Sequence, residues 1–321
     1  MAARAQIEIM TRDRAGFEAT LARSPARSVL PGNPAAAGPP EAVMAGKAAA
    51  ENFPVALRML PRRHRDHLMA VYSYARTVDD IGDEGVPEQR LALLADLEED
   101  LRRLYAQLGG ETGASARPRH PAVRGLASAV TDCGIPMQPF RDLIGANQQD
   151  QLVTRYETFD ELVGYCTLSA NPVGRIVLCV FGCSTPEREE LSDSICTGLQ
   201  IVEHLQDVAE DLHSGRVYLP AEDLRGHGCT EHDLAASTTP PQVRRLIKFE
   251  ADRAGSLISS GAPLVSQLRG SARVAVAGYL AGGRAALAAI ASADYDVLAV
   301  TPKPAKSRTV RELASAMLRG R

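Results

Sequence analysis

Two groups of acidic residues, far apart in the chain, each repeat at the spacing of one helical turn inside largely apolar sequence. The first is Asp79-Asp80-x-x-Asp83, and the second is Glu203-x-x-x-Asp207-x-x-x-Asp211. At about 100° per residue, each group lies along one face of a helix. Carboxylates on a buried helix are destabilising unless they face water or hold cations. Two such faces opposite each other would form an oxygen-rich cleft, and oxygen atoms are the ligands that Mg²⁺ prefers.

The helix expected over residues 62–83 is apolar around most of its circumference, so we expect it to be buried. Tyr72 and Arg76 share the face of the first acidic group, within an arc of roughly 60°. Arg216, shortly after the second group, is another nearby cation. Acidic residues alone would repel a phosphate, whereas a bound metal with guanidinium groups beside it would make a diphosphate site.

The composition favours an all-α protein. Alanine and leucine dominate, β-branched runs are short, and proline and glycine mostly separate periodic segments. With 321 residues and 45% apolar content, the chain can bury a large core. A net charge of −3 gives no reason to expect a nucleic-acid partner. Helices are predicted over residues 43–49, 62–83, 87–107, 120–133, 138–152, 159–182, 187–213, 240–258 and 271–293.

Several features bear on where the protein works. Its six cysteines are scattered without a CxxC pair, which is typical of reduced thiols in the cytoplasm. No stretch reaches about 18 consecutive apolar residues, and the N-terminus lacks the apolar core of a signal peptide, so we expect a soluble protein. Residues 1–42 are rich in Ala, Pro, Gly and Arg and predict a flexible arm. Residues 43–300 would then form the helical domain.

Residues 301–321 are predicted to form a basic tail, with a short amphipathic helix around 308–319. The tail's cations are Lys303, Lys306, Arg308, Arg311, Arg319 and Arg321. Two interpretations stay open, a solvated tail and attraction to anionic lipid headgroups. We therefore expect a cytoplasmic protein, with peripheral contact at the inner face of the membrane as the alternative.

A helical run from Tyr165 to Phe181 is interrupted by Pro172 and Gly174. A proline inside a helix removes a backbone hydrogen bond and kinks the helix. Opened backbone beside a cleft could contact a ligand, and a purely structural kink is the alternative.

Other reaction classes have no support in the sequence. Ser73 and Ser169 have no evident His–Asp arrangement for acyl transfer. No Gly-rich phosphate loop and no dinucleotide fingerprint is present. His64-x-x-His67 lies in a basic run and predicts a solvated turn rather than a zinc site.

The motifs resemble those of the squalene and phytoene synthase family over roughly residues 50–300. The first family motif resembles Tyr72-x-x-x-Arg76-x-x-Asp79-Asp80-x-x-Asp83, and the second resembles Gln206-Asp207-x-x-x-Asp211-x-x-x-Gly215-Arg216-x-Tyr218-x-Pro220. Residues 51–56 and 169–175 are similar to the hydroxysqualene synthases of the bacterial hopanoid pathway. The chain departs from the wider family at Glu203, where Asn is common, and at residues 51–53, where a Ser-Arg-Ser-Phe pattern is common.

The resemblance implies an all-α isoprenoid synthase fold around a central hydrophobic cavity, with Mg²⁺ as cofactor. It implies that presqualene diphosphate loses its diphosphate and that water captures the resulting cation as hydroxysqualene. A presqualene diphosphate synthase would then be the pathway partner. One alternative is the condensation of two prenyl diphosphates to presqualene diphosphate, squalene or phytoene. Another, from a different class, is a non-catalytic assembly factor with the same fold.

The resemblance also implies roles for individual residues. The metal-binding group comprises Asp79, Asp80, Asp83, Glu203, Asp207 and Asp211. The catalytic group comprises Tyr72, Arg76, Tyr165 and Asn171. The substrate-binding group comprises Asn52, Phe53, Arg76, Gln206, Arg216 and Tyr218. Aromatic faces along the cation's path would stabilise it by about 1–2 kcal/mol each, and Asn171 in the bent helix is a hypothetical determinant of where water enters.

Overall fold

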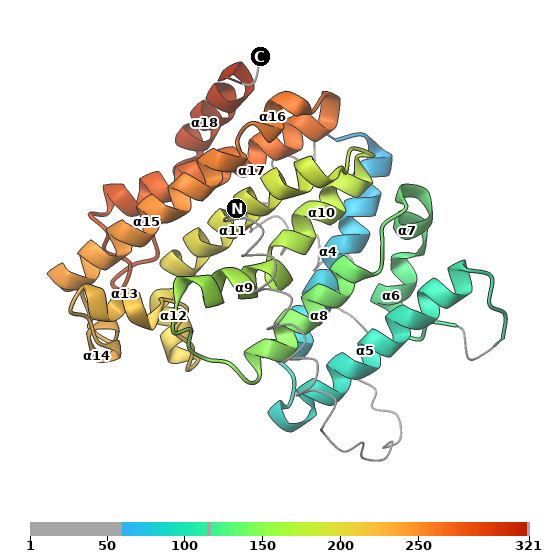
Figure 1. Ribbon diagram of the computed structural model, residues 1–321, viewed down its shortest axis with the longest axis horizontal. Coiled ribbons are helices and arrows are strands. Elements are labelled where there is room, and N and C mark those ends of the chain that lie inside the picture. Colours follow the sequence, from blue (N-terminus) through green and yellow to red (C-terminus); the bar gives the residue numbers. More distant parts are fainter. Residues whose placement is uncertain (1–59, 114–116, 320–321) are drawn as a thin grey trace, which may run out of the picture. The chain divides into compact units, whose positions relative to one another are not determined.

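The computed structural model describes residues 60–113 and 117–319, which form helices joined by short connections (Figure 1). The helices are α4 (Arg62–Asp83), α5 (Pro87–Leu108), α6 (Pro121–Gly125), α7 (Ala127–Cys133), α8 (Gln138–Asp150), α9 (Phe159–Ser169), α10 (Asn171–Val180), α11 (Pro186–Gln206), α12 (Val208–His213), α13 (Ala221–Gly226), α14 (Glu231–Leu234), α15 (Pro241–Gly261), α16 (Leu264–Gln267), α17 (Gly270–Ser292) and α18 (Lys306–Arg319). The only β-contact within these ranges is an isolated bridge between Arg155 and Val217. The all-α prediction is confirmed, while the predicted arm over 1–42, the helix over 43–49, Asn52 and Phe53 lie outside the described residues.

The predicted helices agree with the observed ones except where a single prediction covers two helices. The breaks fall at Leu126, Ala170 and Asp207, inside the segments predicted as 120–133, 159–182 and 187–213. At Ala170 the cause is local, because Pro172 has no N–H with which to continue the hydrogen-bond ladder, and α10 begins afresh with this proline in its first turn. The short helices α13, α14 and α16 carry no periodic signal and were not predicted.

Threonine side chains fix where two of these helices begin. The Thr158 side chain accepts a hydrogen bond from the Glu161 N–H at 3.2 Å and caps α9. The Thr185 side chain accepts one from the Arg188 N–H at 3.3 Å and caps α11, whose first residue is Pro186. Each contact satisfies one of the N–H groups that a helix start leaves without a partner.

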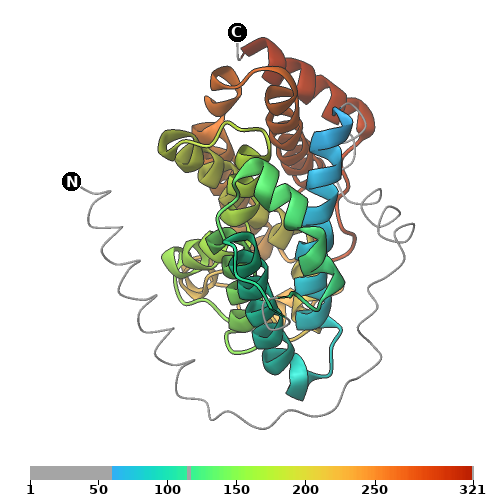
Figure 2. The same ribbon diagram turned by 90° about the vertical axis from the view of Figure 1, so that its right-hand side faces the viewer.

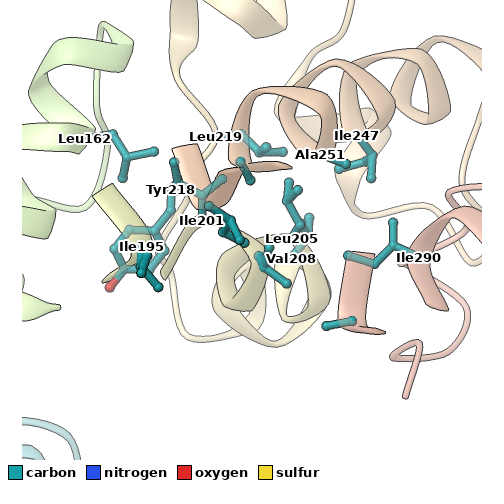
Figure 3. Packing of buried hydrophobic residues seen from close by; sticks show 14 of the residues in the cluster. Leu162, Ile195, Ile201, Leu205, Val208, Tyr218, Leu219, Ile247, Ala251 and Ile290 are labelled. Carbon is teal, nitrogen blue, oxygen red and sulfur yellow. The ribbon is translucent and has the colours of Figure 1, made fainter. Parts of the chain in front are cut away.

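One hydrophobic core lies where α11 packs against α15 and α17. Its buried residues include Ile201, Leu205 and Ile247, which Figure 3 labels among the side chains of this cluster. The helices α11 and α15 come very close at Gly198, where a Cβ atom would lie 2.9 Å from the Ala254 carbonyl oxygen. A larger residue there would push the helices apart, so the glycine sets the position of the second acidic group relative to the core.

A second hydrophobic core surrounds α4, which lies beside α8 in both views (Figures 1 and 2). Leu68, Val71 and Val78 of α4 are buried, and so is Tyr74, whose hydroxyl donates to the Phe140 carbonyl at 3.1 Å. The prediction that α4 is largely buried is confirmed. The acidic end of α4 is therefore anchored by a packed helix rather than by a surface loop.

The predicted solvated turn at His64 and His67 is wrong, because both residues lie in the first turns of α4. His67 is buried, with its Nδ1 3.2 Å from Cys133 Sγ and its Nε2 3.2 Å from Asp132 Oδ2. His64 packs edge-on against Phe181. The basic residues around them had suggested exposure, but the apolar contacts of α4 turn these two imidazoles toward α7 and α10.

Two helical stretches are long and apolar enough to span a bilayer, contrary to the sequence-based expectation. They are residues 159–180 and 270–292, and about half of each window is buried against other parts of the protein. Their buried residues, among them Ile176, Leu178 and Leu280, belong to the two cores. This packing is typical of core helices, which pass the same length and hydropathy test.

The predicted helix in the basic tail is confirmed as α18, which packs on α17. Ala316 is buried, and Arg273 of α17 donates to the Met317 carbonyl at 2.8 Å. Val310 and Leu318, each 64% exposed, and exposed Lys306 and Arg311 lie elsewhere on α18. The tail is thus a docked helix with exposed apolar and cationic residues.

Candidate active site

The first acidic group lies at the C-terminal end of α4, and each of its aspartates has a different partner. Asp79 accepts a hydrogen bond from Asn147 Nδ2 at 3.1 Å. Asp80 forms an ion pair with Arg76 at 2.8 Å, one turn earlier. Asp83 is 54% exposed and forms an ion pair with Arg216 at 3.0 Å. Burial therefore decreases along the group, and its last carboxylate reaches solvent.

Close packing of α4 on α8 makes the Asp79 contact possible. Gly82 is buried, and a Cβ atom at this position would lie 2.2 Å from Asn147 Oδ1. On the next turn of α8, the Gln151 side chain donates to the Gly82 carbonyl at 3.1 Å. Because residue 82 has no side chain, the amides of α8 reach the backbone and carboxylates at the end of α4.

The second acidic group runs along successive turns, as predicted. The N–H of Asp207 donates to the Glu203 carbonyl at 3.1 Å, and the N–H of Asp211 donates to the Asp207 carbonyl at 2.8 Å. Glu203 is exposed, while Asp207 and Asp211 are partly buried. The stripe persists although Asp207 itself separates α11 from α12.

Arg216 links the two acidic groups. Its backbone N–H donates to the Asp211 carbonyl at 2.8 Å, and its guanidinium donates to Asp83 Oδ1 at 3.0 Å. The contact runs from Asp83 of the first group to Arg216, which follows the second group, and a cleft lined by both sets of carboxylates stays a prediction. A guanidinium beside the carboxylate of Asp83 is well placed to bind a phosphate oxygen once a cation shares the negative charge.

Burial and neighbouring carboxylates raise the pKa of two aspartates, Asp79 and Asp207. Burial raises the pKa of Asp79 to about 6, opposed by the Asn147 hydrogen bond and assisted by the charge of Asp83. Burial also raises the pKa of Asp207, with further contributions from Asp211 and Glu210. The surroundings of these two carboxylates disfavour their charged forms, and a bound cation would stabilise those charged forms.

The donor set fits a magnesium ion that keeps water and phosphate ligands. Mg²⁺ commonly takes one or two carboxylates and completes its octahedron with water and substrate oxygens. Within residues 60–113 and 117–319, no three His, Cys, Asp or Glu side chains converge closely enough to hold an ion by themselves. The assignment of the six acidic residues as metal ligands stays a prediction.

An aromatic cluster adjoins the second acidic group. Tyr165 of α9 and Tyr218 are both buried, with ring centroids 5.6 Å apart. His204 of α11 stacks on Tyr218 at 3.8 Å, and its Nδ1 lies 3.8 Å from Asp211 Oδ2. The structure thus brings Tyr165 and Tyr218 together, beside the carboxylates of the second group.

Other predicted residues have contacts of their own. Buried Asn171 accepts a hydrogen bond from Thr197 at 3.0 Å, so its side chain joins α10 to α11. The Gln206 amide donates to the Pro302 carbonyl, ahead of α18. Tyr72 and Arg76 are half-buried on α4, within one turn of each other.

Sequence reasoning missed the part of the site supplied by α8. Asn147 contacts Asp79, and Asp150 accepts hydrogen bonds from both Tyr165 and Tyr218. The run Asn147-Gln-Gln-Asp-Gln151 had no predicted role beyond the helix expected over 138–152. Its signal was the spacing of Asn147 and Asp150, which share a face one turn apart.

The chain is similar to known proteins over most of its length. The sequence model described as squalene/phytoene synthase matches residues 47–311. The chain belongs to the squalene/phytoene synthase family. The site described above therefore belongs to a member of a family of isoprenoid-synthesis enzymes that process prenyl diphosphates.

Individual members of the family show how the similarity is distributed. The chain is 38% identical to a hydroxysqualene synthase of Rhodopseudomonas palustris, over 68% of this chain and 72% of that protein. It is 30% identical to a phytoene synthase of Mycobacterium tuberculosis, over 69% and 71% of the two chains. The structure resembles that of squalene synthase HpnC from Alicyclobacillus acidocaldarius, with a TM-score of 0.71, 40% identity, and 79% and 94% of the two chains covered. The family is common to all three, whereas the activities in their names differ.

Proposed function

We propose that this family member converts presqualene diphosphate to hydroxysqualene with the help of Mg²⁺. The observation that carries the proposal is the pairing of Arg216 with Asp83, which holds a guanidinium against the first acidic group while its backbone N–H donates to the Asp211 carbonyl. The similarity to hydroxysqualene synthases supports this choice of step within the family.

The residues of the chain would bind the leaving group at the charged end of the site. Arg216 and Arg76 would hold diphosphate oxygens through their planar guanidinium groups. Asp79, Asp80, Asp83, Glu203, Asp207 and Asp211 would hold the metal. When bound, Mg²⁺ would neutralise the charge that develops on the departing diphosphate.

The aromatic cluster would act on the other product of ionisation. Breaking the carbon–oxygen bond to diphosphate leaves a carbocation, and the buried rings of Tyr165 and Tyr218 would stabilise it through their faces. Tyr72, on the same face of α4 as Arg76, would orient the substrate. The cation would rearrange, with a carbon–carbon bond of the cyclopropane ring breaking. Water would then form the new carbon–oxygen bond and release one proton, giving the alcohol.

An alternative within the family is the joining of two prenyl diphosphates. It is supported by the similarity to a phytoene synthase and to a solved squalene synthase. Under the preferred proposal, a separate presqualene diphosphate synthase must supply the substrate, so the two enzymes would be pathway partners.

Product analysis separates these functions. Purified full-length protein is incubated with Mg²⁺ and either farnesyl or presqualene diphosphate, and the lipid extract is analysed by mass spectrometry. We expect hydroxysqualene from presqualene diphosphate and no conversion of farnesyl diphosphate. Diphosphate release from farnesyl diphosphate alone would overturn the proposed step in favour of condensation.

We also propose that the protein works in the cytoplasm and contacts an anionic bilayer through α18. Val310 and Leu318 supply exposed apolar side chains, and exposed Lys306 and Arg311 supply positive charge on the same helix. This combination suits a helix that lies in the headgroup region.

A further inference from the structure

Asp150 is the shared acceptor for two tyrosines that come from different parts of the chain. It is the last residue of α8, and it accepts a hydrogen bond from Tyr165 of α9 at 2.8 Å. Its other oxygen accepts one from Tyr218, beyond α12, at 3.1 Å. One carboxylate therefore fixes the hydroxyl ends of both rings.

The rings are also held along their faces. Tyr156 lies 5.6 Å from Tyr165 and 5.8 Å from Tyr218, measured between ring centroids. On its other side, Tyr218 stacks on His204 at an interplanar angle of 13°. With the rings confined in this way, the shared carboxylate decides the direction of each hydroxyl group.

This arrangement changes the chemistry that the tyrosines offer. A phenol has one proton to donate, and here both protons are directed at Asp150, so each phenol oxygen meets any other neighbour as an acceptor. A hydrogen bond to a carboxylate also moves electron density into the ring, which strengthens the attraction of its face for a cation.

Asp150 faces a defined set of charged and titratable groups. They are Tyr165 from α9, His204 from α11, and Arg216 and Tyr218 from the segment after α12. Burial raises the pKa of Asp150, and the hydrogen bonds from both tyrosines with the charges of Arg216 and His204 oppose this rise. The same groups that favour its charged form thus connect it to the proposed diphosphate site.

We propose that Asp150 is a positioning residue, which orients Tyr165 and Tyr218 and increases their electron density for stabilisation of the carbocation. The inference rests on the proposed function, because it assigns these rings to the cation formed from a prenyl diphosphate. Asp150 itself would touch neither the substrate nor the metal and would act through the two rings.

The test is a double-mutant cycle between Asp150 and the two tyrosines. Wild type, Asp150→Asn, Y165F/Y218F and the triple variant are assayed for kcat and KM on whichever prenyl diphosphate the wild type consumes. We expect D150N to lower kcat about 10- to 100-fold, with KM changed by less than about threefold. In the Y165F/Y218F background the same substitution should change kcat by less than about twofold, because the groups through which it acts are gone.

A matched control separates this role from a general loss of packing. Asp142 is a buried carboxylate on the same helix and accepts a hydrogen bond from Gln138 at 2.7 Å. Asp142→Asn should leave kcat within about threefold of wild type. If D150N does not fold, as judged by circular dichroism, Asp150→Glu takes its place in the cycle, because it keeps the charge and moves it by one methylene.

The outcomes for the two proposals are distinct. Equal losses of kcat from D150N in both backgrounds, or a loss seen only in KM, would overturn the positioning role. If the wild type consumes farnesyl but not presqualene diphosphate, the proposed step is wrong, and the cycle still measures the role of Asp150. If the wild type consumes neither, the proposed function fails, and the inference that rests on it fails for that reason alone.

Discussion

Arg216 donates to Asp83 across 3.0 Å, and this contact joins the C-terminal end of α4 to the segment after α12. The two residues are far apart in the sequence: Asp83 belongs to the first acidic group, and Arg216 follows the second. When diphosphate and metal bind, the guanidinium is expected to exchange part of this contact for phosphate oxygens. The pair thus links two segments of the chain, and the diphosphate of the substrate would compete with Asp83 for the Arg216 guanidinium.

Replacing Arg216 by alanine should weaken substrate binding more than it weakens the fold. We expect KM for the diphosphate substrate to rise about 10- to 100-fold, and Arg216→Lys to recover only part of this, since lysine lacks the planar fork. Steady-state kinetics provides the measurement. Arg225→Ala is the matched control, because Arg225 pairs with Glu157 in an exposed ion pair. Equal kinetics for R216A and R225A would refute the role of Arg216.

The first acidic group should be essential for turnover but not for folding. Asp79→Asn combined with Asp83→Asn should lower kcat at least about 100-fold, while the helical circular-dichroism spectrum stays close to that of wild type. Asn can still accept the hydrogen bond from Asn147, which explains why the fold is retained. Asp96→Asn, at an exposed position on α5, is the control. Removal of Mg²⁺ by a chelator should reproduce this loss of turnover. Turnover that survives both the substitutions and the chelator would show that these carboxylates are not needed for catalysis.

A methyl group at Gly82 should separate α4 from α8. A Cβ atom there would lie 2.2 Å from Asn147 Oδ1, so Gly82→Ala must displace the amide that binds Asp79. We expect the free energy of unfolding in urea to fall by about 1–3 kcal/mol. Gly145→Ala in α8, where a Cβ atom would meet nothing within 4 Å, should instead be neutral or stabilising by up to about 1 kcal/mol. Similar changes in the two variants would show that close packing at Gly82 is unimportant.

Glu250 should make stability depend on pH. Burial raises its pKa to about 8, opposed by Arg253 and assisted by Asp223, from an ordinary value of 4.5. Between these values the folded chain binds more protons than the unfolded one, so the free energy of unfolding should decrease as pH rises from 4.5 toward about 8. Glu250→Gln cannot titrate and should flatten this slope. Urea unfolding of both proteins at about pH 5.5 and about pH 8.5 measures it, and parallel slopes would contradict the assignment.

The exposed apolar and cationic residues of α18 should bind anionic vesicles. We expect sedimentation with phosphatidylglycerol-containing vesicles and little with phosphatidylcholine alone, because Lys306 and Arg311 need an anionic surface. Lys306→Glu with Arg311→Glu should abolish binding, and Val310→Ser with Leu318→Ser should weaken it. Arg225→Glu, on the exposed surface of α13, serves as the charge control. Binding that is equal for both vesicle types, or unaffected by the α18 variants, would exclude this surface.

Much of the site could be predicted from local patterns. The spacing of Asp79 and Asp83 already placed them on one helix face, and the backbone hydrogen bonds of Asp207 and Asp211 confirm the second stripe. Asp150 was missed because a carboxylate at a helix end usually faces solvent, and nothing in its neighbours indicated two tyrosines from other segments. His67 was misjudged for the opposite reason, since its basic neighbours suggested exposure.

The sequence alone determined the helices, the two acidic faces and the family resemblance, because these depend on periodicity and on residues close together in the chain. Only the tertiary structure decided that Arg216 pairs with Asp83 and that Asp150 accepts hydrogen bonds from two tyrosines. It also decided that close packing at Gly82 places Asn147 against Asp79. Each of these contacts joins segments whose relative position is fixed by how the helices pack, and packing depends on the shapes of many side chains at once.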